Sequence, residues 1–340
     1  MQQGATLLSL DETMPQMLHE AITDARAWKR ETLSPEAWLV PFPQACFAEL
    51  DAVVQFLRHY PQPVAHLRPA AFELTACASV MAHVHVQIHS HVGFAVVDRV
   101  PVERYSVTEN RTIGWLLASL LGQVVAQKWD GTLLYDVQDS GKPFGHGVRR
   151  SVTNLEQPFH TDGGWLWMPP SAIGLFCLQP AQQGGLSRLV SLCTAHNELW
   201  RCHPDLLARL YRPFWWDRQA EHAPDDVCVS RHPVYQYDGR TLMARYYDDY
   251  VCHGARLAGE ALDTAGTAAL AAMRAILDAP ENWVEFRVEQ GQLQYINNRQ
   301  FAHARTAFGE TSGVRSPRHM LRLWNRNEGT PDLEGQVDTV

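Results

Sequence analysis

The chain has 340 residues, of which 46% are hydrophobic and 19% are charged, and its formal net charge is −8. Disorder requires low hydrophobicity and high net charge, so this composition predicts a folded protein with a large core. The acidic balance and the absence of any lysine- and arginine-rich run disfavour a nucleic-acid partner. The 16 histidines are a high count, and they direct attention to metal or proton chemistry.

Neither the ends of the chain nor its cysteines indicate export or membrane insertion. No stretch approaches the roughly 18 consecutive apolar residues that span a bilayer, and the first ten residues lack the features of a secretory signal. The seven cysteines are scattered and form no C-x-x-C pair, so neither a zinc knuckle nor a dithiol redox centre is expected. We therefore expect a reduced, cytoplasmic protein without a membrane partner.

The first third of the chain is predicted to be mainly helical. Residues 44–58 carry apolar side chains at helical spacing between prolines that mark both ends. Residues 70–90 form an alanine-rich helix candidate, and residues 113–128 have a broad apolar face. A short strand is expected between these two helices, at residues 92–97.

Short strands and turns replace this helical periodicity in the rest of the chain. The predicted strands are residues 172–178, 186–192, 233–237, 241–246, 283–288, 293–296 and 319–324. Glycine turns join the third to the fourth and the fifth to the sixth, so two hairpins are expected. Helices at 196–210 and 262–278 interrupt the strands, and residues 139–158 and 212–232 are candidate lid loops.

Many short strands without a regular β-α alternation favour an α+β or mainly β fold, either a sandwich or a jelly roll. No repeat or linker divides the chain, so one catalytic domain over residues 1–340 is expected. Within it we predict a helical N-terminal extension (1–90), a jelly-roll core with helical insertions (91–326) and a frayed tail (327–340).

A candidate metal site begins at the end of a predicted strand, where His160 and Asp162 are separated by one residue. Side chains alternate along a strand, so an imidazole and a carboxylate at this spacing point to the same side. His303, which follows another strand, is the candidate third ligand. Two histidines and one carboxylate on one face of a metal are typical of non-haem Fe(II) oxygenases.

Two arginines near the C-terminus suggest an anion site beside this metal. Arg318 and Arg322 form an R-x-x-x-R pair in the last predicted strand, where they share one face with Met320. A guanidinium on the inner face of a barrel is costly unless it meets an anion, and its fork suits a carboxylate.

These motifs together resemble the taurine dioxygenase/2,4-D dioxygenase (TauD/TfdA) superfamily of Fe(II)- and 2-oxoglutarate-dependent oxygenases. The likeness covers roughly residues 90–325. It is carried by Phe159–Gly164, the Pro169–Pro170 pair, Gly184–Ser187, Asn298–Arg299 ahead of His303, and the terminal R-x-x-x-R. The fold that this resemblance implies is a double-stranded β-helix, a clavaminate-synthase-like jelly roll wrapped by helices.

The resemblance also implies a role for each motif residue. His160, Asp162 and His303 would bind Fe(II). Arg322 would hold the distal carboxylate of the cosubstrate 2-oxoglutarate with help from the hydroxyl of Ser187, and Arg318 would lie near its metal-chelating end or the substrate. With O2 as second cosubstrate, the enzyme would hydroxylate an unactivated C–H bond of a small polar molecule and release succinate and CO2.

Several alternatives remain open at the level of the sequence. Asp162 disfavours halogenation, because halogenating relatives have a small residue there, but desaturation, cyclisation or dealkylation can use the same machinery. A zinc-dependent hydrolase could use the same three ligands, and a jelly-roll binding protein could have lost catalysis. An amino-acid-like molecule or a natural-product intermediate is the expected substrate, and a homo-oligomer is compatible with the sequence.

Candidate substrate contacts are assigned from their place near the motifs. Glu156 lies just upstream of His160, Arg245 is a second polar candidate, and Trp165 follows the His-x-Asp motif. Other nearby aromatic residues could line the same pocket or pack in the core: Trp167, Trp215, Trp216, Tyr246 and Tyr247. The four histidines between His83 and His91 contain no acidic residue that would complete a second metal site.

Overall fold

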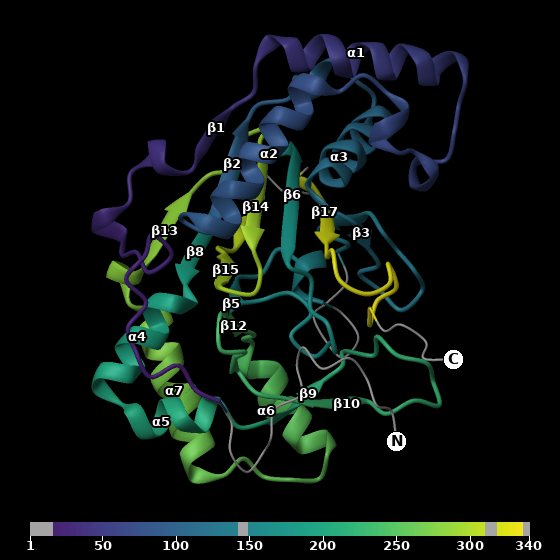
Figure 1. The fold of residues 1–340 in the computed structure, drawn as a ribbon. Helices are drawn as coiled ribbons and strands as arrows, with labels where there is room; N and C mark the ends of the chain where they lie inside the picture. Colours follow the sequence, from purple (N-terminus) through teal and green to yellow (C-terminus); the bar gives the residue numbers. More distant parts are fainter. Residues whose placement is uncertain (1–15, 142–148, 310–317, 336–340) are drawn as a thin grey trace.

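Two β-sheets provide the framework of the computed structural model, which describes residues 16–141, 149–309 and 318–335 (Figure 1). The large sheet has the order β1-β2-β14-β6-β17-β3, and β4 also pairs with β17. Its strands are β1 (Leu39–Pro41), β2 (Phe94–Asp98), β14 (Leu293–Asn297), β6 (Ala172–Gln179), β17 (His319–Asn325), β3 (Val124–Val125) and β4 (Tyr135–Gln138).

The small sheet has the order β13-β8-β15-β5, and all of its pairings are antiparallel. Its strands are β13 (Trp283–Phe286), β8 (Ser187–Ser191), β15 (Phe301–Arg305) and β5 (Gln157–His160). Three further antiparallel pairs are β9 (Phe214–Asp217) with β10 (Val229–His232), β11 (Tyr235–Tyr237) with β12 (Leu242–Ala244), and β7 (Gln183–Gly184) with β16 (Phe308–Gly309).

Helices cover the large sheet on the side away from the small one (Figure 1). These are α1 (Gln44–His59), α2 (Thr75–Ser90) and α3 (Val107–Leu121). Their apolar faces form one buried cluster with alternate residues of the large sheet, among them Phe176, Leu293 and Leu321. This burial fixes which face of each strand points away from the helices, and therefore toward the interior between the sheets.

A second group of helices lies beside the small sheet (Figure 1). It contains α4 (Leu192–Cys202), α5 (Pro204–Leu210), α6 (Asp248–Leu257) and α7 (Thr264–Asp278). Short 3-10 turns connect several elements: Arg30–Thr32, Pro35–Ala37, Val64–His66, Pro69–Ala71, Val102–Arg104, Arg150–Val152 and Pro280–Asn282. No helix within the described ranges has the length and apolar character needed to cross a bilayer.

The helix expected at residues 113–128 begins and ends earlier than predicted. Ser106 accepts from the Glu109 backbone N–H, while the Glu109 carboxylate accepts from the Ser106 backbone N–H at 2.7 Å. This capping box starts α3 at Val107, and Gly122 ends it. The helix expected at 196–210 is similarly divided, because Pro204 begins a new helix after α4 ends at Cys202.

One of the two predicted hairpins is confirmed and the other is wrong. β11 and β12 pair across the Asp238-Gly239 turn. The strands expected at 283–288 and 293–296 exist but lie in different sheets, since β13 pairs with β8 while β14 pairs with β2 and β6. Every residue of β14 is buried, so this strand needs a neighbour on both sides, which a lone hairpin does not provide.

Two segments expected to be irregular are ordered by pairing or packing. The candidate lid 212–232 contains the β9–β10 hairpin, and 139–158 contains the start of β5. The predicted fraying of the tail is wrong for residues 328–335, because Arg326 donates to carbonyls of Thr330 and Asp332 and Leu333 is buried. The remaining tail, 336–340, and the middle of the first lid, 142–148, lie outside the described residues.

Candidate active site

His160, Asp162 and His303 meet at the end of the small sheet. His160 on β5 and His303 on β15 are direct cross-strand partners, and their ring centroids are 4.2 Å apart. The Asp162 Oδ1 atom lies 3.5 Å from His160 Nε2. One ligand atom from each residue lies within 4.8 Å of the others, and all three side chains are buried. The structure thus brings the three predicted ligands together.

Hydrogen bonds orient these side chains independently of a metal. His160 Nδ1 lies 2.9 Å from the Pro158 carbonyl oxygen, to which it can only donate, so Nε2 keeps its lone pair on the side of Asp162. The other carboxylate oxygen, Asp162 Oδ2, accepts from Trp324 Nε1 at 2.9 Å and from Arg322 Nη1 at 3.0 Å. Asp162 Oδ1 is left to face the histidines.

The backbone of the His-x-Asp segment is clamped by Asn298, in the turn between β14 and β15. Its Oδ1 atom accepts from the Asp162 backbone N–H at 2.8 Å, and its Nδ2 donates to the carbonyls of Asp162 and Pro170 at 2.9 and 3.0 Å. The Asn298 motif and the His-x-Asp motif are therefore parts of one structure, although 136 positions separate Asn298 from Asp162 in sequence.

Burial and neighbouring charges set the ionisation states that a metal requires. Burial alone would raise the pKa of Asp162, but the nearby Arg322 guanidinium and the two histidines hold it well below its usual range. Burial, reinforced by His160, lowers the pKa of His303 to about 3. Asp162 is thus a carboxylate and His303 a neutral imidazole near neutral pH, and a divalent metal is bound in these forms.

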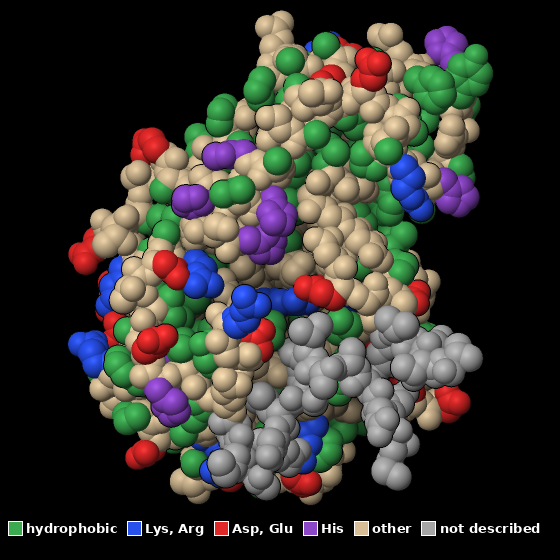
Figure 2. Space-filling model, in the orientation of Figure 1, with side chains coloured by type: hydrophobic (Ala, Val, Ile, Leu, Met, Phe, Trp, Pro, Cys, Tyr) green, Lys and Arg blue, Asp and Glu red, His purple; other side chains and the backbone are tan. Residues whose placement is uncertain are grey.

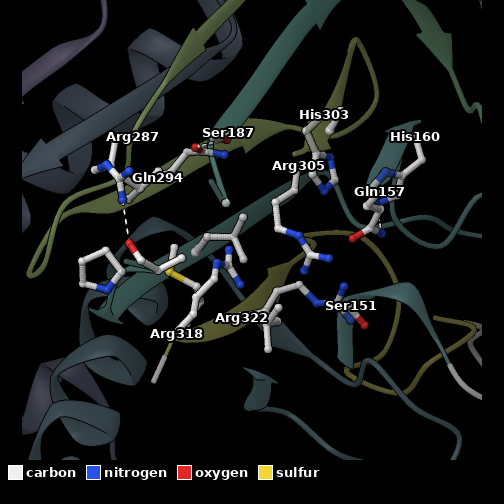
Figure 3. Close-up of a pocket in the computed structure, with 18 residues that line it drawn as sticks. Ser151, Gln157, His160, Ser187, Arg287, Gln294, His303, Arg305, Arg318 and Arg322 are labelled. Carbon is white, nitrogen blue, oxygen red and sulfur yellow. Dashed lines mark hydrogen bonds between the residues drawn. The ribbon is translucent and has the colours of Figure 1, made fainter. Parts of the chain in front are cut away.

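A cavity of about 660 Å³ opens beside these residues, between the two sheets (Figure 3). We call it the arginine cavity, because its charged wall consists of Arg287, Arg305, Arg318 and Arg322. No aspartate or glutamate lines it among the residues that the structure describes. Its other residues are Val137, Ser151, Gln157, His160, Leu175, Pro180, Ala181, Gly185, Ser187, Val288, Gln294, His303, Ala304 and Met320.

Several buried donors in this wall have no hydrogen-bond acceptor. They are Gln294 Nε2, Arg305 Nε and Arg322 Nη2. The hydroxyl of Ser187 donates to Gln294 Oε1 at 2.6 Å, which leaves the amide nitrogen of Gln294 as the donor on the cavity side. Buried donors without acceptors are costly, so this set fits a ligand that supplies several acceptor oxygens and negative charge. A dicarboxylate such as 2-oxoglutarate has both.

The positions of Arg318 and Arg322 are the reverse of what the sequence analysis expected. Both line the cavity with Met320, as strand alternation predicts. Arg322, however, contacts Asp162 and so lies at the metal end. Arg318 lies at the other side, beside Gly185 and over the Phe308 ring, and Figure 3 draws Arg322 between it and His160. The end with Ser187 therefore belongs to Arg318.

A second cavity of about 330 Å³ adjoins the ligands on the side of Asp162. We call it the aromatic cavity, after Trp165, Tyr247, Tyr250 and Trp324 in its wall. It shares Ser151, Gln157, His160 and Arg322 with the arginine cavity, so the ligand site lies where the two meet. The remaining wall residues are Arg149, Arg150, Thr161, Asp162 and Gly163.

The candidate substrate residues have three different environments. Trp165 lines the aromatic cavity as expected. Arg245 is buried but lines neither cavity, because its Nη1 donates to the carbonyls of Gly164 and Leu166 at 2.8 Å and supports the turn after Asp162. Glu156 is also outside both: its carboxylate is exposed and lies 3.5 Å from Arg188. It precedes β5 and points into a separate cleft beside α7.

Sequence reasoning missed several residues of the two cavities, among them two amides and two arginines. Gln157 Nε2 lies 2.8 Å from His160 Nε2, and Gln294 is paired with Ser187, but neither amide belongs to a recognisable motif. Arg149 forms an ion pair with Glu221, and Arg150 lies 3.8 Å from the Asp249 carboxylate. The available signal was two adjacent arginines ten residues ahead of the His-x-Asp motif, inside a segment interpreted only as a lid.

The other aromatic and histidine candidates lie elsewhere. Tyr247 lines the aromatic cavity, whereas Trp216 is fully buried in the core and Trp215 donates to Glu260. Histidines gather over α2 (Figure 2), where the His85 and His89 rings are 4.5 Å apart. Within the described ranges, only His160, Asp162 and His303 form a group of three residues able to hold a metal.

The fold and this ligand set define an Fe(II)- and 2-oxoglutarate-dependent dioxygenase. The model of the "Taurine catabolism dioxygenase TauD, TfdA family" matches residues 63–324. Because this match covers most of the chain, the protein belongs to that family. The predicted enzyme class, double-stranded β-helix fold and dependence on Fe(II) and 2-oxoglutarate are thereby confirmed.

Two curated relatives match almost the whole chain. FR-33289 synthase of Streptomyces rubellomurinus is 26% identical over 317 residues, which are 92% of this chain and 92% of the relative. The taurine hydroxylase-like protein SAT17 of Stachybotrys chartarum is 25% identical over 328 residues, covering 92% of this chain and 82% of the relative.

Solved structures share the fold at lower sequence identity. Asparagine oxygenase in complex with Fe(II), 2S,3S-3-hydroxyasparagine and succinate has a TM-score of 0.62 and 18% identity, covering 87% of this chain and 94% of its own. The non-heme iron oxygenase OrfP in complex with Fe and alpha-ketoglutaric acid has a TM-score of 0.60 and 14% identity, covering 85% and 94%.

Proposed function

We propose that this protein hydroxylates an aliphatic C–H bond of a small, acidic molecule, such as an amino-acid-like compound or a natural-product intermediate. His160, Asp162 and His303 bind Fe(II), and 2-oxoglutarate occupies the arginine cavity. The observation that carries this proposal is the position of the three ligands at the junction of two cavities, one of them walled by arginines without carboxylates. The bound iron and cosubstrate supply the activation of O2.

The chain's own residues position the cosubstrate. Arg318, Ser187 and Gln294 hold the distal carboxylate at the far end of the arginine cavity. Arg322 orients Asp162 through Oδ2, which leaves Oδ1 for the metal, and its remaining donor faces the cavity. The Arg318 guanidinium and the Gln294 amide, which the Ser187 hydroxyl orients, would together select the direction in which a dicarboxylate binds.

The aromatic cavity is assigned to the substrate, because it adjoins Asp162 on the side away from Arg318. Its wall contains three arginines and one carboxylate, Asp162, among the described residues. Arg149 lies 5.9 Å from the centroids of the Tyr135 and Trp165 rings and forms an ion pair with Glu221, and Arg150 lies 3.8 Å from the Asp249 carboxylate. This wall favours a substrate with an acidic group. The amino-acid products bound in the asparagine oxygenase and OrfP structures carry such a group.

Substrate position decides which C–H bond reacts, and exclusion of water protects the reaction. The rings of Trp165, Tyr247 and Tyr250 line the aromatic cavity beside the ligands, and Trp165 and Tyr250 pack edge to face. Family membership and the arginine cavity favour this oxygenase over a zinc hydrolase or a binding protein, in which the cavity would have no role. Desaturation, cyclisation or dealkylation would use the same residues with a different substrate pose.

The test is anaerobic reconstitution with Fe(II) and 2-oxoglutarate, followed by visible spectroscopy. A weak charge-transfer band should appear in the wild type and disappear in His303→Ala together with the bound iron. His89→Ala, a histidine of α2 outside the site, is the matched control and should retain both. A wild type without the band, or a His303→Ala variant that keeps its iron, would contradict the metal assignment.

A second experiment identifies the substrate class. Small acidic compounds are incubated with the reconstituted enzyme, and succinate release is measured against uncharged analogues of the same skeleton. We expect release to be coupled only to compounds with a carboxylate, sulfonate or phosphonate. Release coupled equally to the uncharged analogues would contradict the assignment of an acidic substrate.

A further inference from the structure

Arg305 connects the arginine cavity to the segment that forms the mouth of the aromatic cavity. It lies at the end of β15, two residues after His303, and only 7% of its surface is exposed. Its Nη2 atom donates to the carbonyls of Thr153 at 2.9 Å, Leu155, and more weakly Arg150 at 3.4 Å. We call residues 149–156, which carry these carbonyls, the mouth segment.

The mouth segment is held by hydrogen bonds rather than by a sheet: besides those from Arg305, the Ser140 N–H donates to the Val152 carbonyl and the Phe308 N–H to the Asn154 carbonyl, each at 3.0 Å. It contains the 3-10 turn Arg150–Val152 and reaches β5 only at its end. Its residues Arg149, Arg150 and Ser151 line the aromatic cavity. Arg305 therefore helps to position the arginines of the proposed substrate site.

The other side of the same guanidinium faces the arginine cavity. Arg305 Nε is buried and has no hydrogen-bond acceptor. Figure 3 shows the guanidinium directed into the middle of the cavity, between His303 and Arg322. No carboxylate forms an ion pair with Arg305 among the described residues, although Asp139 lies near enough to offset part of its charge. Burial, reinforced by the positive charge of the neighbouring Arg318, lowers the pKa of Arg305 to about 9.

We propose that Arg305 couples cosubstrate binding to the mouth segment. When 2-oxoglutarate occupies the arginine cavity, its negative charge offsets that of the guanidinium and a carboxylate oxygen accepts from Nε. The plane of the guanidinium is then fixed from both sides, because Nη2 already donates to the mouth segment. Cosubstrate binding thereby stabilises the segment in the position that receives the substrate, which makes Arg305 a positioning residue for the substrate site. This inference rests on the proposed function, since it takes 2-oxoglutarate as the anion.

The coupling has a direct readout in amide hydrogen exchange, which requires no substrate and no turnover. Under anaerobic conditions the Fe(II)-loaded wild type is compared with and without 2-oxoglutarate. We expect exchange in residues 149–156 to slow by about fivefold or more, the effect of stabilising one hydrogen bond. In Arg305→Gln at saturating 2-oxoglutarate, with the charge-transfer band present, this slowing should be absent.

Arg287→Gln is the matched control. Arg287 lines the same cavity, but its Nη1 donates to the Ala181 carbonyl at 2.7 Å and it has no contact with the mouth segment. This variant should show the same slowing as the wild type once 2-oxoglutarate is saturating. If it loses the slowing as completely as Arg305→Gln, the effect follows cavity charge in general and the proposal is overturned.

Two further results bear on the proposal. Persistent slowing in Arg305→Gln, or no slowing in a wild type that shows the charge-transfer band, would overturn it. Absence of the band in the wild type would instead contradict the proposed function itself. If Arg305→Gln does not fold, Arg305→Lys replaces it, because a lysine keeps the charge but cannot bridge both sides in one plane. A reduced slowing in that variant supports the proposal, and an unchanged slowing overturns it.

Discussion

The arginine cavity and the aromatic cavity meet at the same three ligands but are built from different parts of the chain. Most of the arginine cavity is formed by strands of both sheets: Ser187 on β8, Gln294 on β14, His303 and Arg305 on β15, and Arg322 on β17. Most of the aromatic cavity is formed by connections, including residues 149–151 and 161–165. A constant cosubstrate is held by the rigid framework, and a variable substrate by segments that can change without disturbing it.

Charge follows the same division. In the arginine cavity, Arg287 and Arg305 donate to backbone carbonyls and Arg305 Nε has no acceptor, whereas Arg322, which both cavities share, forms an ion pair with Asp162. The arginines specific to the aromatic cavity, Arg149 and Arg150, lie near carboxylates, Glu221 and Asp249. A strongly positive pocket suits a dianion that must be bound in every turnover. A partly balanced pocket suits a substrate that binds and leaves as product.

The largest effect is expected at the metal ligands, because both cavities depend on them. Asp162→Ala removes one metal ligand and the acceptor of Arg322 Nη1 and Trp324 Nε1. We expect activity to fall by at least about a thousandfold with loss of iron. Metal analysis and succinate release measure this, and Asp136→Ala on β4 serves as control. An iron content equal to that of the wild type would contradict the assignment.

The next effect separates the two ends of the arginine cavity. Arg318→Gln removes the proposed grip on the distal carboxylate, so the dissociation constant for 2-oxoglutarate should rise by about a hundredfold. Titration of the charge-transfer band gives this constant. Iron affinity measured without 2-oxoglutarate should stay close to that of the wild type. If iron affinity falls and 2-oxoglutarate affinity does not, Arg318 lies at the metal end and Arg322 holds the distal carboxylate, as the sequence motif predicts.

A smaller effect is expected from the groups that orient Asp162. Trp324→Phe removes the donor to Asp162 Oδ2 and conserves most of the ring. Loss of such an orienting hydrogen bond typically weakens metal binding by about ten- to a hundredfold. Iron titration in a chelator buffer measures the change. Trp324→Phe with wild-type iron affinity would mean that Arg322 alone orients the carboxylate.

A still smaller and more selective effect is expected in the aromatic cavity. Arg150→Gln should raise KM for the acidic substrate about tenfold, because one charge-assisted hydrogen bond is lost. KM for 2-oxoglutarate should not change. Steady-state kinetics with each compound varied in turn measures both constants. Arg256→Gln in the last turn of α6 is an arginine control outside both cavities. Equal increases in KM for the substrate and for 2-oxoglutarate would contradict the assignment of the two compounds to separate cavities.

The last and smallest effect is expected in the stability of the framework, through a buried histidine. His196 on α4, which packs against β15, is fully buried with its Nε2 2.9 Å from the Tyr211 hydroxyl, and burial lowers its pKa to about 4. The unfolded chain binds a proton at this position below its ordinary pKa of about 6.5, and the folded chain does not. The free energy of unfolding should therefore fall by up to about 1.4 kcal/mol per pH unit as the pH decreases from 6.5 toward 4, and then level off. Denaturant unfolding of the wild type and His196→Gln measures this, and an identical slope in the variant would contradict it.

The division between cavities also explains how far the sequence could be interpreted. His160, His303 and Arg322 lie on strands, and Asp162 and Arg318 lie within two residues of a strand end, so alternation along the strand predicts the direction of their side chains. The sequence could not say which of Arg318 and Arg322 lies at the metal end, because strand alternation gives the face of a residue but not its place along the cavity. Glu156 and Arg245 were chosen by nearness in sequence, which carries no information about direction outside a strand.

The same limit applies to the fold. Local signals predict most helices and strands, and the Ser106–Glu109 capping box marks the start of α3 in the sequence itself. The crossing between β13 and β14 could not be predicted from adjacent residues, because it depends on partners far along the chain, β8 and β2. Gln157 and Gln294 were missed because an amide becomes informative only once its neighbours are known.

The Asn298 clamp bears on how the site loses and regains its metal. Its three hydrogen bonds join the Asp162 backbone to the turn between β14 and β15 and to Pro170, and none of them passes through a metal. The backbone of Asp162 is therefore held in the same place whether or not iron is bound. Loss of iron would leave this part of the site preformed for rebinding the metal.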